Sequence, residues 1–380
     1  MQPIAGFFTN IFAMCHFILN LLIHISLMKT TRDVTIYDVA KALNISPSTV
    51  SRGLKDHPHI HADTRKRIKA MAREMGYQQN KFASSLRKRS TETIGVVVPK
   101  LNSYFMATVI AGMEEITNQN GYGLIISQSQ EAGKKETGCV STLFHSRVDG
   151  LLVSLAYDTE NIDHFNQILR KNIPVVFFDR VANCPGCMGI VIDNFRAGYE
   201  VTSHLISQGC RRIMHVSGNL LRNVYSGRFE GYRQALADNG IAFDNELLMV
   251  SELSSQAGSE AAQAVLRMKD RPDGIFAAND TSAVAVICEL QKSGIRIPAD
   301  IAVAGFNNEP VSRVIKPCLT TVDYPAREIG RLAASSLINI LNNKGTSSLS
   351  TIIVKHELIV RESTLRKKPQ ASKKHEAGNQ

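Results

Sequence analysis

The sequence predicts an all-α unit at the N-terminus, followed by an α/β core in which two doubly wound parallel sheets form two subdomains. Three observations predict this fold class. Apolar stripes at helical spacing occupy residues 34–76, apolar runs alternate with helical patterns from residue 93 onward, and the positive charge is concentrated before residue 91. The chain has 380 residues, 44% of them hydrophobic, which suits a globular protein of two or three domains.

The net charge of +10 is distributed unevenly along the chain. Residues 29–90 hold 14 lysines and arginines against 5 acidic residues, and residues 361–380 hold 6 against 2. Residues 91–360, by contrast, hold 24 basic and 27 acidic residues. A basic excess on one small unit indicates a polyanion as its partner, although a merely solvated basic face is the alternative.

The first 28 residues form an apolar extension with two possible interpretations. The stretch IFAMCHFILNLLIHISLM resembles a membrane segment, yet it contains His16, Asn20 and His24, and no basic residue precedes it. Translation that begins at Met28 is favoured over a membrane anchor, and both interpretations stay open.

Residues 34–76 predict three short helices. The first has an apolar stripe at i, i+3, i+4 and i+7, formed by Ile36, Val39, Ala40 and Leu43. Thr35 and Asp38 are placed as its capping pair. Ser46 can cap a second helix with Pro47 at its first position, and a third helix in TRKRIKAMAREMGY ends at Gly76. Three small helices with a tight turn between the first two make a helix-turn-helix unit.

The second helix of such a unit enters the major groove of DNA, so its outer positions should carry groups that meet bases and phosphates. Pro47, Ser48 and Ser51 occupy its groove-facing part, and Arg52 can reach a guanine edge or a phosphate from the next turn. Hydroxyl groups at helix starts suit phosphate oxygens, and they belong to Thr35, Ser46 and Thr49. A structural hairpin could carry the same residues, but the basic excess favours DNA.

The segment that follows, QQNKFASSLRKRS, predicts a short helix that Asn80 caps and that runs through Leu86. It is too short to be helical alone in water, so it would become ordered only against a partner. An apolar side chain beside basic ones can wedge between base steps in the minor groove, which makes Leu86 a candidate intercalator. A plain interdomain linker explains the spacing equally well.

Seven apolar runs predict buried strands in the core, and they are TIGVVVP, GLIISQS, GLLVSLA, PVVFFD, RIMHVSG, GIFAAND and IAVAGFN. The second half of the core opens near GIVIDN. Two such sheets joined by crossovers leave a cleft at the carboxyl ends of their strands, where ligands bind in open α/β sheets.

The motifs VTIYDVAKALNISPSTVSRGL, MGYQQN, FASSLRKR and TIGVVVP together resemble the LacI family of bacterial transcriptional repressors, and the resemblance runs from Val34 to Ser363. It implies a cytoplasmic homodimer on a pseudopalindromic DNA operator, with two hinge helices in the minor groove. It also implies a periplasmic-binding-protein-like core that binds a small-molecule effector, expected to be a carbohydrate. In the family pattern, the chain crossings back between the two halves of this core come near Ser282 and Val322.

The sequence patterns and the resemblance together divide the chain into five segments. They are the extension 1–28, the helix-turn-helix DNA-binding domain 33–78, the hinge helix and linker 79–90, the effector-binding and dimerisation core 91–363, and a basic disordered tail 364–380. The tail has no apolar heptad repeat that would indicate a coiled coil.

The candidate site residues follow from the motifs and the resemblance together. The expected DNA contacts are Thr35, Ser46, Pro47, Ser48, Thr49, Ser51, Arg52, Lys55, His59, Asn80, Ala83 and Leu86. The expected effector contacts are Tyr104, Phe105, Arg222, Arg228, Asn279, Asp280 and Asn307. Many members of the family have Asp where Asn307 stands, so the amide puts the identity of the effector in doubt.

The sequence contains no motif that indicates catalysis. G-x-S-x-G, G-x-x-x-x-G-K and G-x-G-x-x-G before a helix are all missing, and no cofactor is expected. Seven scattered cysteines do not suggest a disulfide framework, and CPGC at 184–187 is interpreted as a turn rather than a metal or redox site. The competing function is a sugar-receptor type of binding protein that does not bind specific DNA.

Overall fold

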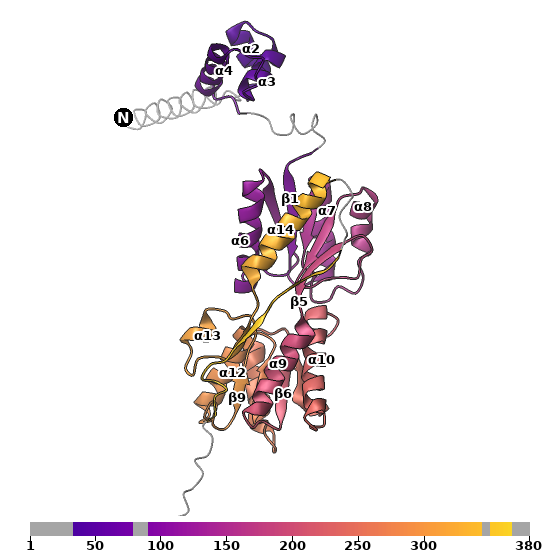
Figure 1. Ribbon diagram of the computed structural model, residues 1–380, viewed down its shortest axis with the longest axis vertical. Coiled ribbons are helices and arrows are strands. Elements are labelled where there is room, and N and C mark those ends of the chain that lie inside the picture. The colour runs from indigo at the N-terminus through magenta and orange to yellow at the C-terminus, as the bar shows by residue number, and fades with distance from the viewer. Residues whose placement is uncertain (1–32, 79–89, 344–349, 367–380) are drawn as a thin grey trace, which may run out of the picture. The chain divides into compact units, whose positions relative to one another are not determined.

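The computed structural model describes residues 33–78, 90–343 and 350–366 of the chain. It contains two compact units, Met1–Arg87 and Lys88–Gln380 (Figure 1). The predicted extension 1–28 and the predicted hinge contacts Asn80, Ala83 and Leu86 lie outside the described residues. Within the described ranges, no helix is both long and apolar enough to cross a membrane.

The first unit is the predicted bundle of three helices, which are α2 (Ile36–Leu43), α3 (Pro47–Leu54) and α4 (Ala62–Glu74). Val39, Val50 and Ile68, one from each helix, have no solvent exposure and form the centre of its small core. The apolar stripes read from the sequence therefore face one another, and the polar faces point outward.

The predicted helix boundaries are confirmed by local hydrogen bonds. Thr35 donates its backbone N–H to Asp38 Oδ2 over 2.8 Å, and Ser46 Oγ accepts from the backbone N–H of Thr49 at 3.2 Å. Gly76, just beyond α4, has φ of +67°, a conformation that glycine adopts without strain.

Gly53 allows α3 and α4 to approach closely. A Cβ atom at this position would lie 2.4 Å from Ile68 Cδ1, closer than two carbon atoms can pack. The absence of a side chain at one position of α3 thus lets the buried Ile68 fill the centre of the bundle.

The second unit begins with a six-stranded parallel sheet in the order β11-β5-β4-β3-β1-β2. The strands are β1 (Thr93–Val98), β2 (Gly123–Gln128), β3 (Gly150–Val153), β4 (Val175–Phe178), β5 (Met188–Ile192) and β11 (Ile352–Val354). The helices around it are α6 (Tyr104–Gln119), α7 (Gly133–His145), α8 (Asn166–Arg170) and α14 (Ala326–Asn343), with a 3-10 turn at Asp163–Phe165. In β1, Val96 packs in the cluster with α6 and α14, whereas Val97 packs in the cluster with α7 and α8. Both faces of the sheet are therefore covered, as parallel sheets require.

A four-stranded parallel sheet in the order β7-β6-β8-β9 forms the second subdomain. Its strands are β6 (Ile213–Ser217), β7 (Leu248–Val250), β8 (Gly274–Ala277) and β9 (Ala302–Ala304). Its helices are α9 (Asn194–Ser207), α10 (Asn223–Asp238), α11 (Ser255–Arg267), α12 (Asp280–Lys292) and α13 (Val311–Val314), with a 3-10 turn at Asn245–Leu247. The seven predicted strands are confirmed, while β5, β7 and β11 were not among the predicted apolar runs.

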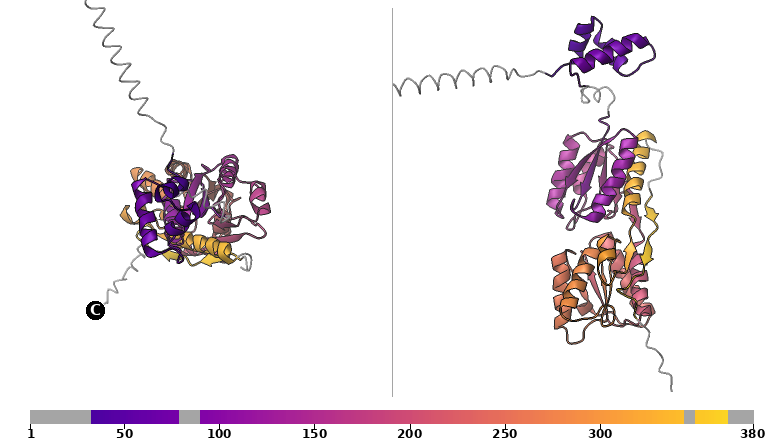
Figure 2. Two further views of the ribbon diagram at one scale, coloured as in Figure 1. Left: turned by 90° about the horizontal axis from the view of Figure 1, so that it is seen from above. Right: turned by 90° about the vertical axis from the view of Figure 1, so that its left-hand side faces the viewer.

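Within the described part of the second unit, the chain passes between the two subdomains three times (Figure 2). It passes from β5 to α9, from β10 (Thr321–Asp323) to α14, and from β11 to β12 (Glu357–Ile359), with β10 and β12 paired antiparallel. The crossing predicted near Val322 is confirmed. The one predicted near Ser282 is wrong, because Ser282 lies fully buried inside α12 of the second subdomain.

The core extends beyond the predicted boundary at residue 363. Thr364 is fully buried, and its hydroxyl hydrogen-bonds His204 Nε2 at 2.7 Å. Arg366 donates from Nε to the carbonyl oxygen of Pro298 at 3.0 Å. The prediction of a disordered tail is therefore wrong for residues 364–366, and residues 367–380 lie outside the described part.

The loop between β4 and β5 contains the CPGC motif. It turns at Gly186, which has φ of +80°, as the sequence indicated. Cys184 and Cys187 are joined by a disulfide, which the sequence analysis did not expect. The turn brings their Cα atoms to 5.3 Å, a separation that a disulfide can span. No group of three or more metal-ligating side chains occurs among the residues the structure describes.

Candidate functional site

The first candidate site is the outer face of α3. Val50 and Gly53 are buried against the other helices, whereas Ser48 and Arg52 are exposed and Ser51 is half-buried. Pro47 begins the helix and is also half-buried. The side chains predicted to meet base edges thus lie on the solvent side of the helix, the position of a recognition helix.

The hydroxyl groups at the start of α3 form a local cluster. Ser46 Oγ lies 2.8 Å from Ser48 Oγ and 2.8 Å from Thr49 Oγ1. At the start of α2, Thr35 Oγ1 donates to Asp38 Oδ2 at 2.6 Å. Thr35 and Ser46 therefore cap helices in this structure, and the Thr49 hydroxyl bonds that of Ser46. Any bond from these three hydroxyl groups to phosphate would use the donors and lone pairs that remain.

The surface of the first unit is rich in cations without carboxylate partners. Lys69 pairs with Asp56 at 2.7 Å, and Arg65 donates to the carbonyl oxygen of Asp56. Among residues 33–78, the exposed cations that make no ion pair are Lys41, Arg52, Lys55, Lys66, Arg67 and Arg73. His59 is exposed as well, in the loop after α3. Such a surface suits a polyanion.

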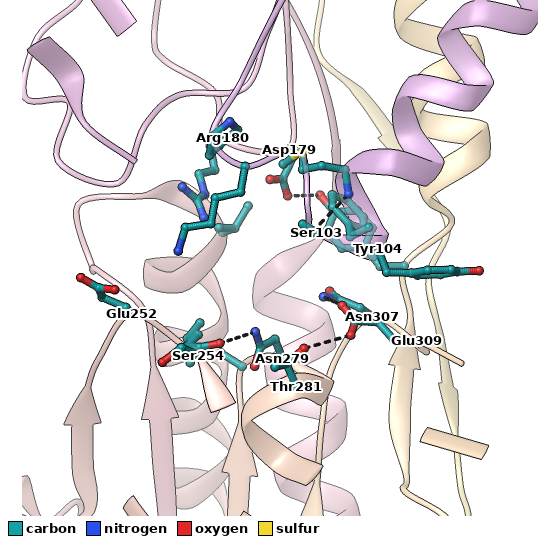
Figure 3. A pocket seen from close by; sticks show the side chains of 18 of the residues that line it. Ser103, Tyr104, Asp179, Arg180, Glu252, Ser254, Asn279, Thr281, Asn307 and Glu309 are labelled. Atoms are coloured by element: carbon teal, nitrogen blue, oxygen red, sulfur yellow. Dashed lines mark hydrogen bonds between the residues drawn. The ribbon is translucent and has the colours of Figure 1, made fainter. Parts of the chain in front are cut away.

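The second candidate site is a cavity of about 400 Å³ between the two subdomains of the second unit. Figure 3 shows Asp179 and Arg180 on one wall, with Glu252, Asn279, Asn307 and Glu309 on the facing wall. The volume lies in the usual range for sites that hold small molecules. The cavity is found where the sequence predicted the cleft, at the carboxyl ends of the strands.

Five of the seven predicted effector contacts line this cavity, and they are Tyr104, Phe105, Arg228, Asn279 and Asn307. Phe105 is buried and packs against the Tyr324 ring at 4.5 Å between centroids, whereas Tyr104 is 54% exposed. Asn279 caps α12, where its Oδ1 accepts from the backbone N–H of Ser282 at 2.9 Å.

Arg222, the other arginine predicted to contact the effector, does not line the cavity. It is buried at the start of α10, and its Nη2 donates to the carbonyl oxygen of Thr159 in the other subdomain. The helix start directs the side chain toward the loop after β3 rather than into the cleft. Arg222 thus holds the two subdomains together.

Asp280 is also absent from the cavity lining. Its Oδ2 accepts from the backbone N–H of Glu309 at 2.7 Å, and its Oδ1 accepts from Thr321 Oγ1 at 2.6 Å. Burial raises the pKa of Asp280 to about 7, against the opposing effect of these hydrogen bonds. Asp280 therefore stabilises the loop that carries Asn307 and Glu309.

Arg228 lines the cavity from α10 and is only 3% exposed. Nε donates to Asn194 Oδ1 at 3.0 Å, and Nη1 donates to the carbonyl oxygen of Ala278 at 2.8 Å. Burial lowers the pKa of Arg228, while the nearby Asp179 opposes that shift. Among the described residues Nη2 has no hydrogen-bond partner, so it remains for a ligand.

Sequence reasoning missed two residues that follow β4. Asp179, with φ of +58°, accepts from Tyr324 Oη at 2.9 Å, and burial raises its pKa. Arg180 pairs with Glu131 at 2.6 Å and donates to Tyr225 Oη at 3.0 Å across the subdomains. Their position directly after the run PVVFF was the signal that could have identified them.

The facing wall holds further polar groups that were not predicted, and they include Glu252, Ser254, Thr281 and Glu309. Glu309 follows Asn307 and Asn308, which have φ of +108° and +53°. This uncommon pair of backbone conformations turns the chain so that both Asn307 and Glu309 line the cavity.

Comparisons with known proteins relate both sites to one family. Residues 35–80 match the bacterial regulatory proteins of the lacI family, and residues 202–364 match the periplasmic binding protein-like domain. The HTH-type transcriptional regulator RegA of Clostridium saccharobutylicum is 31% identical over 335 residues, which cover 87% of this chain and 99% of RegA. The chain belongs to the LacI family. A second relative, the repressor PurR of Proteus mirabilis, is 32% identical over 87% of this chain and 96% of its own.

Solved structures agree with this LacI-family assignment. The lac repressor dimer bound to operator has the same fold, with a TM-score of 0.80 and 24% identity over 88% of this chain and all of the repressor chain. The regulator CelR in complex with cellobiose has a TM-score of 0.66 and 26% identity over 87% of this chain and 99% of its own. This LacI-family protein is therefore a DNA-binding transcription regulator with a periplasmic-binding-protein-like core.

Proposed function

We propose that this LacI-family chain is a repressor that binds a pseudopalindromic operator as a homodimer. A small carbohydrate in the cleft controls its affinity for the operator. The observation that carries this proposal is the cavity itself, because its walls come from both subdomains. A ligand that contacts both walls changes the free energy of one subdomain arrangement relative to another.

The lining of the cavity supports a carbohydrate as the effector. Polar groups that converge on an aromatic wall suit a ring that has hydroxyl groups on its edge and apolar C–H groups on its face. Phe105 and Tyr324 supply that wall, and the free Nη2 of Arg228 supplies a donor. Among the relatives, the ribose operon repressor of Haemophilus influenzae is 30% identical over 87% of this chain.

Several bonds across the subdomains would transmit ligand binding. Arg180 donates to Tyr225 Oη, and Tyr157 Oη donates to the carbonyl oxygen of Ser251 at 3.0 Å. A ligand that alters the cleft must rearrange these contacts. An effector that favours the DNA-competent arrangement acts as a co-repressor, and one that favours the alternative acts as an inducer.

The proposal also covers the cellular compartment of the protein and whether it catalyses a reaction. A repressor acts where the chromosome is, so we place the protein in the cytoplasm, without a membrane partner. We assign it binding rather than catalysis and no cofactor, because the relatives named above are transcription regulators.

Selection of genomic DNA fragments tests the proposal. Protein that begins at Met28 is mixed with the fragments at near-physiological salt, and the bound DNA is sequenced. We expect a pseudopalindrome with a flexible central step, and we expect the neighbouring genes to indicate the effector. Recovery of no common sequence would overturn the proposal in favour of a sugar-receptor type of binding protein without specific DNA binding.

A further inference from the structure

The charged groups that line the cleft do not balance one another. The cations are Lys100, Arg180 and Arg228, and the carboxylates are Glu131, Asp179, Glu252 and Glu309. Most of these charges are compensated by a neighbour: Arg180 pairs with Glu131, and Arg228 lies close enough to Asp179 for each to stabilise the charge of the other. Lys100 and two carboxylates, Glu252 and Glu309, remain in the lining, and Glu252 is exposed to solvent.

Of the two remaining carboxylates, Glu309 is the buried one. The residue is only 8% exposed, and it accepts from Thr281 Oγ1 at 3.1 Å and from Asn307 Nδ2 at 3.3 Å. Both donors are neutral, and no lysine or arginine of the described residues forms an ion pair with it. A buried carboxylate without a cation is unfavourable in free energy, because neutral donors replace only part of its hydration.

A second carboxyl group, that of Asp280, lies next to Glu309 and brings no positive charge to it. Asp280 accepts the backbone N–H of Glu309, and the Glu309 charge contributes to the raised pKa of Asp280. The guanidinium of Arg361 interacts electrostatically with Asp280, but it donates to Asn308 Oδ1 and to the carbonyl oxygen of Leu319, both at 2.7 Å, rather than to a carboxylate. This end of the cleft therefore attracts a cation that the described part of the protein does not provide.

We propose that the effector is an amino sugar, whose protonated amine lies against Glu309. This inference rests on the proposed function, because it specifies the ligand of the same cleft. The amine supplies the missing counter-charge and donates charge-assisted hydrogen bonds to the carboxylate. A hydroxyl group of the same ligand accepts from the free Nη2 of Arg228. The neutral amide of Asn307 beside Glu309 leaves a single carboxylate for a single amine.

Calorimetric titration of the full-length protein tests this inference. The probes are glucosamine, galactosamine and mannosamine, each compared with its parent hexose, its N-acetyl derivative and the corresponding uronic acid. We expect at least one amine to bind more than about tenfold more tightly than all three of its counterparts. Glu309→Gln should reduce that preference to less than about threefold, since the amide keeps the shape and removes the charge. Glu260→Gln, an equal charge change on the exposed side of α11, should preserve the preference.

Three results would overturn the inference. They are binding of a neutral hexose or a uronic acid as tightly as its amine, an unchanged preference in Glu309→Gln, and no binding of any probe. None of these bears on whether the protein selects an operator, so the proposed function and the amine are tested separately. Thermal melting of Glu309→Gln confirms that the variant is folded.

Discussion

The guanidinium carbon of Arg228 lies 3.5 Å from the centre of the Phe306 ring. The same side chain binds Asn194, at the point where the chain enters α9 from the first subdomain, and Ala278, at the end of β8. Arg228 therefore contacts the cavity, the crossing between subdomains and the sheet of the second subdomain at once. A ligand bound to this group acts directly on the joint between the subdomains.

Arg228→Met should abolish the response of operator binding to the effector and leave the affinity of the ligand-free protein unchanged. Methionine fills the space over Phe306 but cannot donate to Asn194 or Ala278, so the free energy of unfolding should fall by about 1–3 kcal/mol. Fluorescence anisotropy with labelled operator measures both affinities. Arg233→Met, an exposed position on the same helix, is the matched control. An unchanged response would remove Arg228 from the effector site.

Arg222→Met should weaken the contact between the subdomains without removing a ligand contact. The carbonyl oxygen of Thr159 loses its donor, so we expect the free energy of unfolding to fall by about 1–3 kcal/mol. Effector affinity, measured by calorimetry, should stay within about threefold of the original. A loss of affinity of more than about tenfold would instead place Arg222 in the binding site, as the family resemblance implied.

Arg52→Ala should reduce binding to the selected operator by about 1–3 kcal/mol, because Arg52 is exposed on α3 and has no carboxylate partner among the described residues. Binding to unrelated DNA should fall much less. Competition titrations on both DNAs measure the difference, and Arg170→Ala, an exposed position outside the first unit, controls for charge. Equal losses on both DNAs would assign Arg52 to phosphate rather than base contact.

The N-terminal unit could be predicted almost completely from the sequence, because its signals are local. The capping pair of Thr35 and Asp38, the cap at Ser46 and the stop at Gly76 each act within one helical turn. Strands of the core were predicted equally well, since both-face burial produces continuous apolar runs. The crossing misplaced at Ser282 depends on which sheet the next strand joins, which no local pattern specifies.

The effector cleft was predicted only in part, because it is assembled from loops that are distant in sequence. The strand-end rule identified Asn279 and Asn307, and applied to β4 it would have identified Asp179. The same rule misplaced Asp280. It identifies a residue near the mouth of the cleft but does not determine the direction in which the side chain points. The place of Glu309 in the cavity lining depends on the positive φ angles of Asn307 and Asn308. It could not be predicted, because an Asn-Asn pair does not specify such angles.

His215 makes the stability of the core dependent on pH. It is fully buried and stacked between aromatic rings, with the Phe276 ring at 4.5 Å and the Tyr232 ring at 5.2 Å. Its Nδ1 donates to the carbonyl oxygen of Phe276 at 3.0 Å, while Nε2 has no partner among the described residues. Burial, with a smaller effect of the Arg228 charge, lowers the pKa of His215 to about 4.

The unfolded chain therefore binds a proton at His215 near pH 6.5, whereas the folded chain binds it only near pH 4. The stabilising effect of keeping this ring neutral is present above pH 6.5 and is lost as the pH falls to about 4, a change of about 3 kcal/mol. His215→Phe should keep the stacking and remove that loss, at a cost of about 1 kcal/mol for the hydrogen bond to Phe276. Urea unfolding of both proteins between pH 4 and pH 7 measures it. Tyr232→Phe, in the same stack, should lower stability equally at every pH, and a parallel pH dependence in His215→Phe would contradict the assignment.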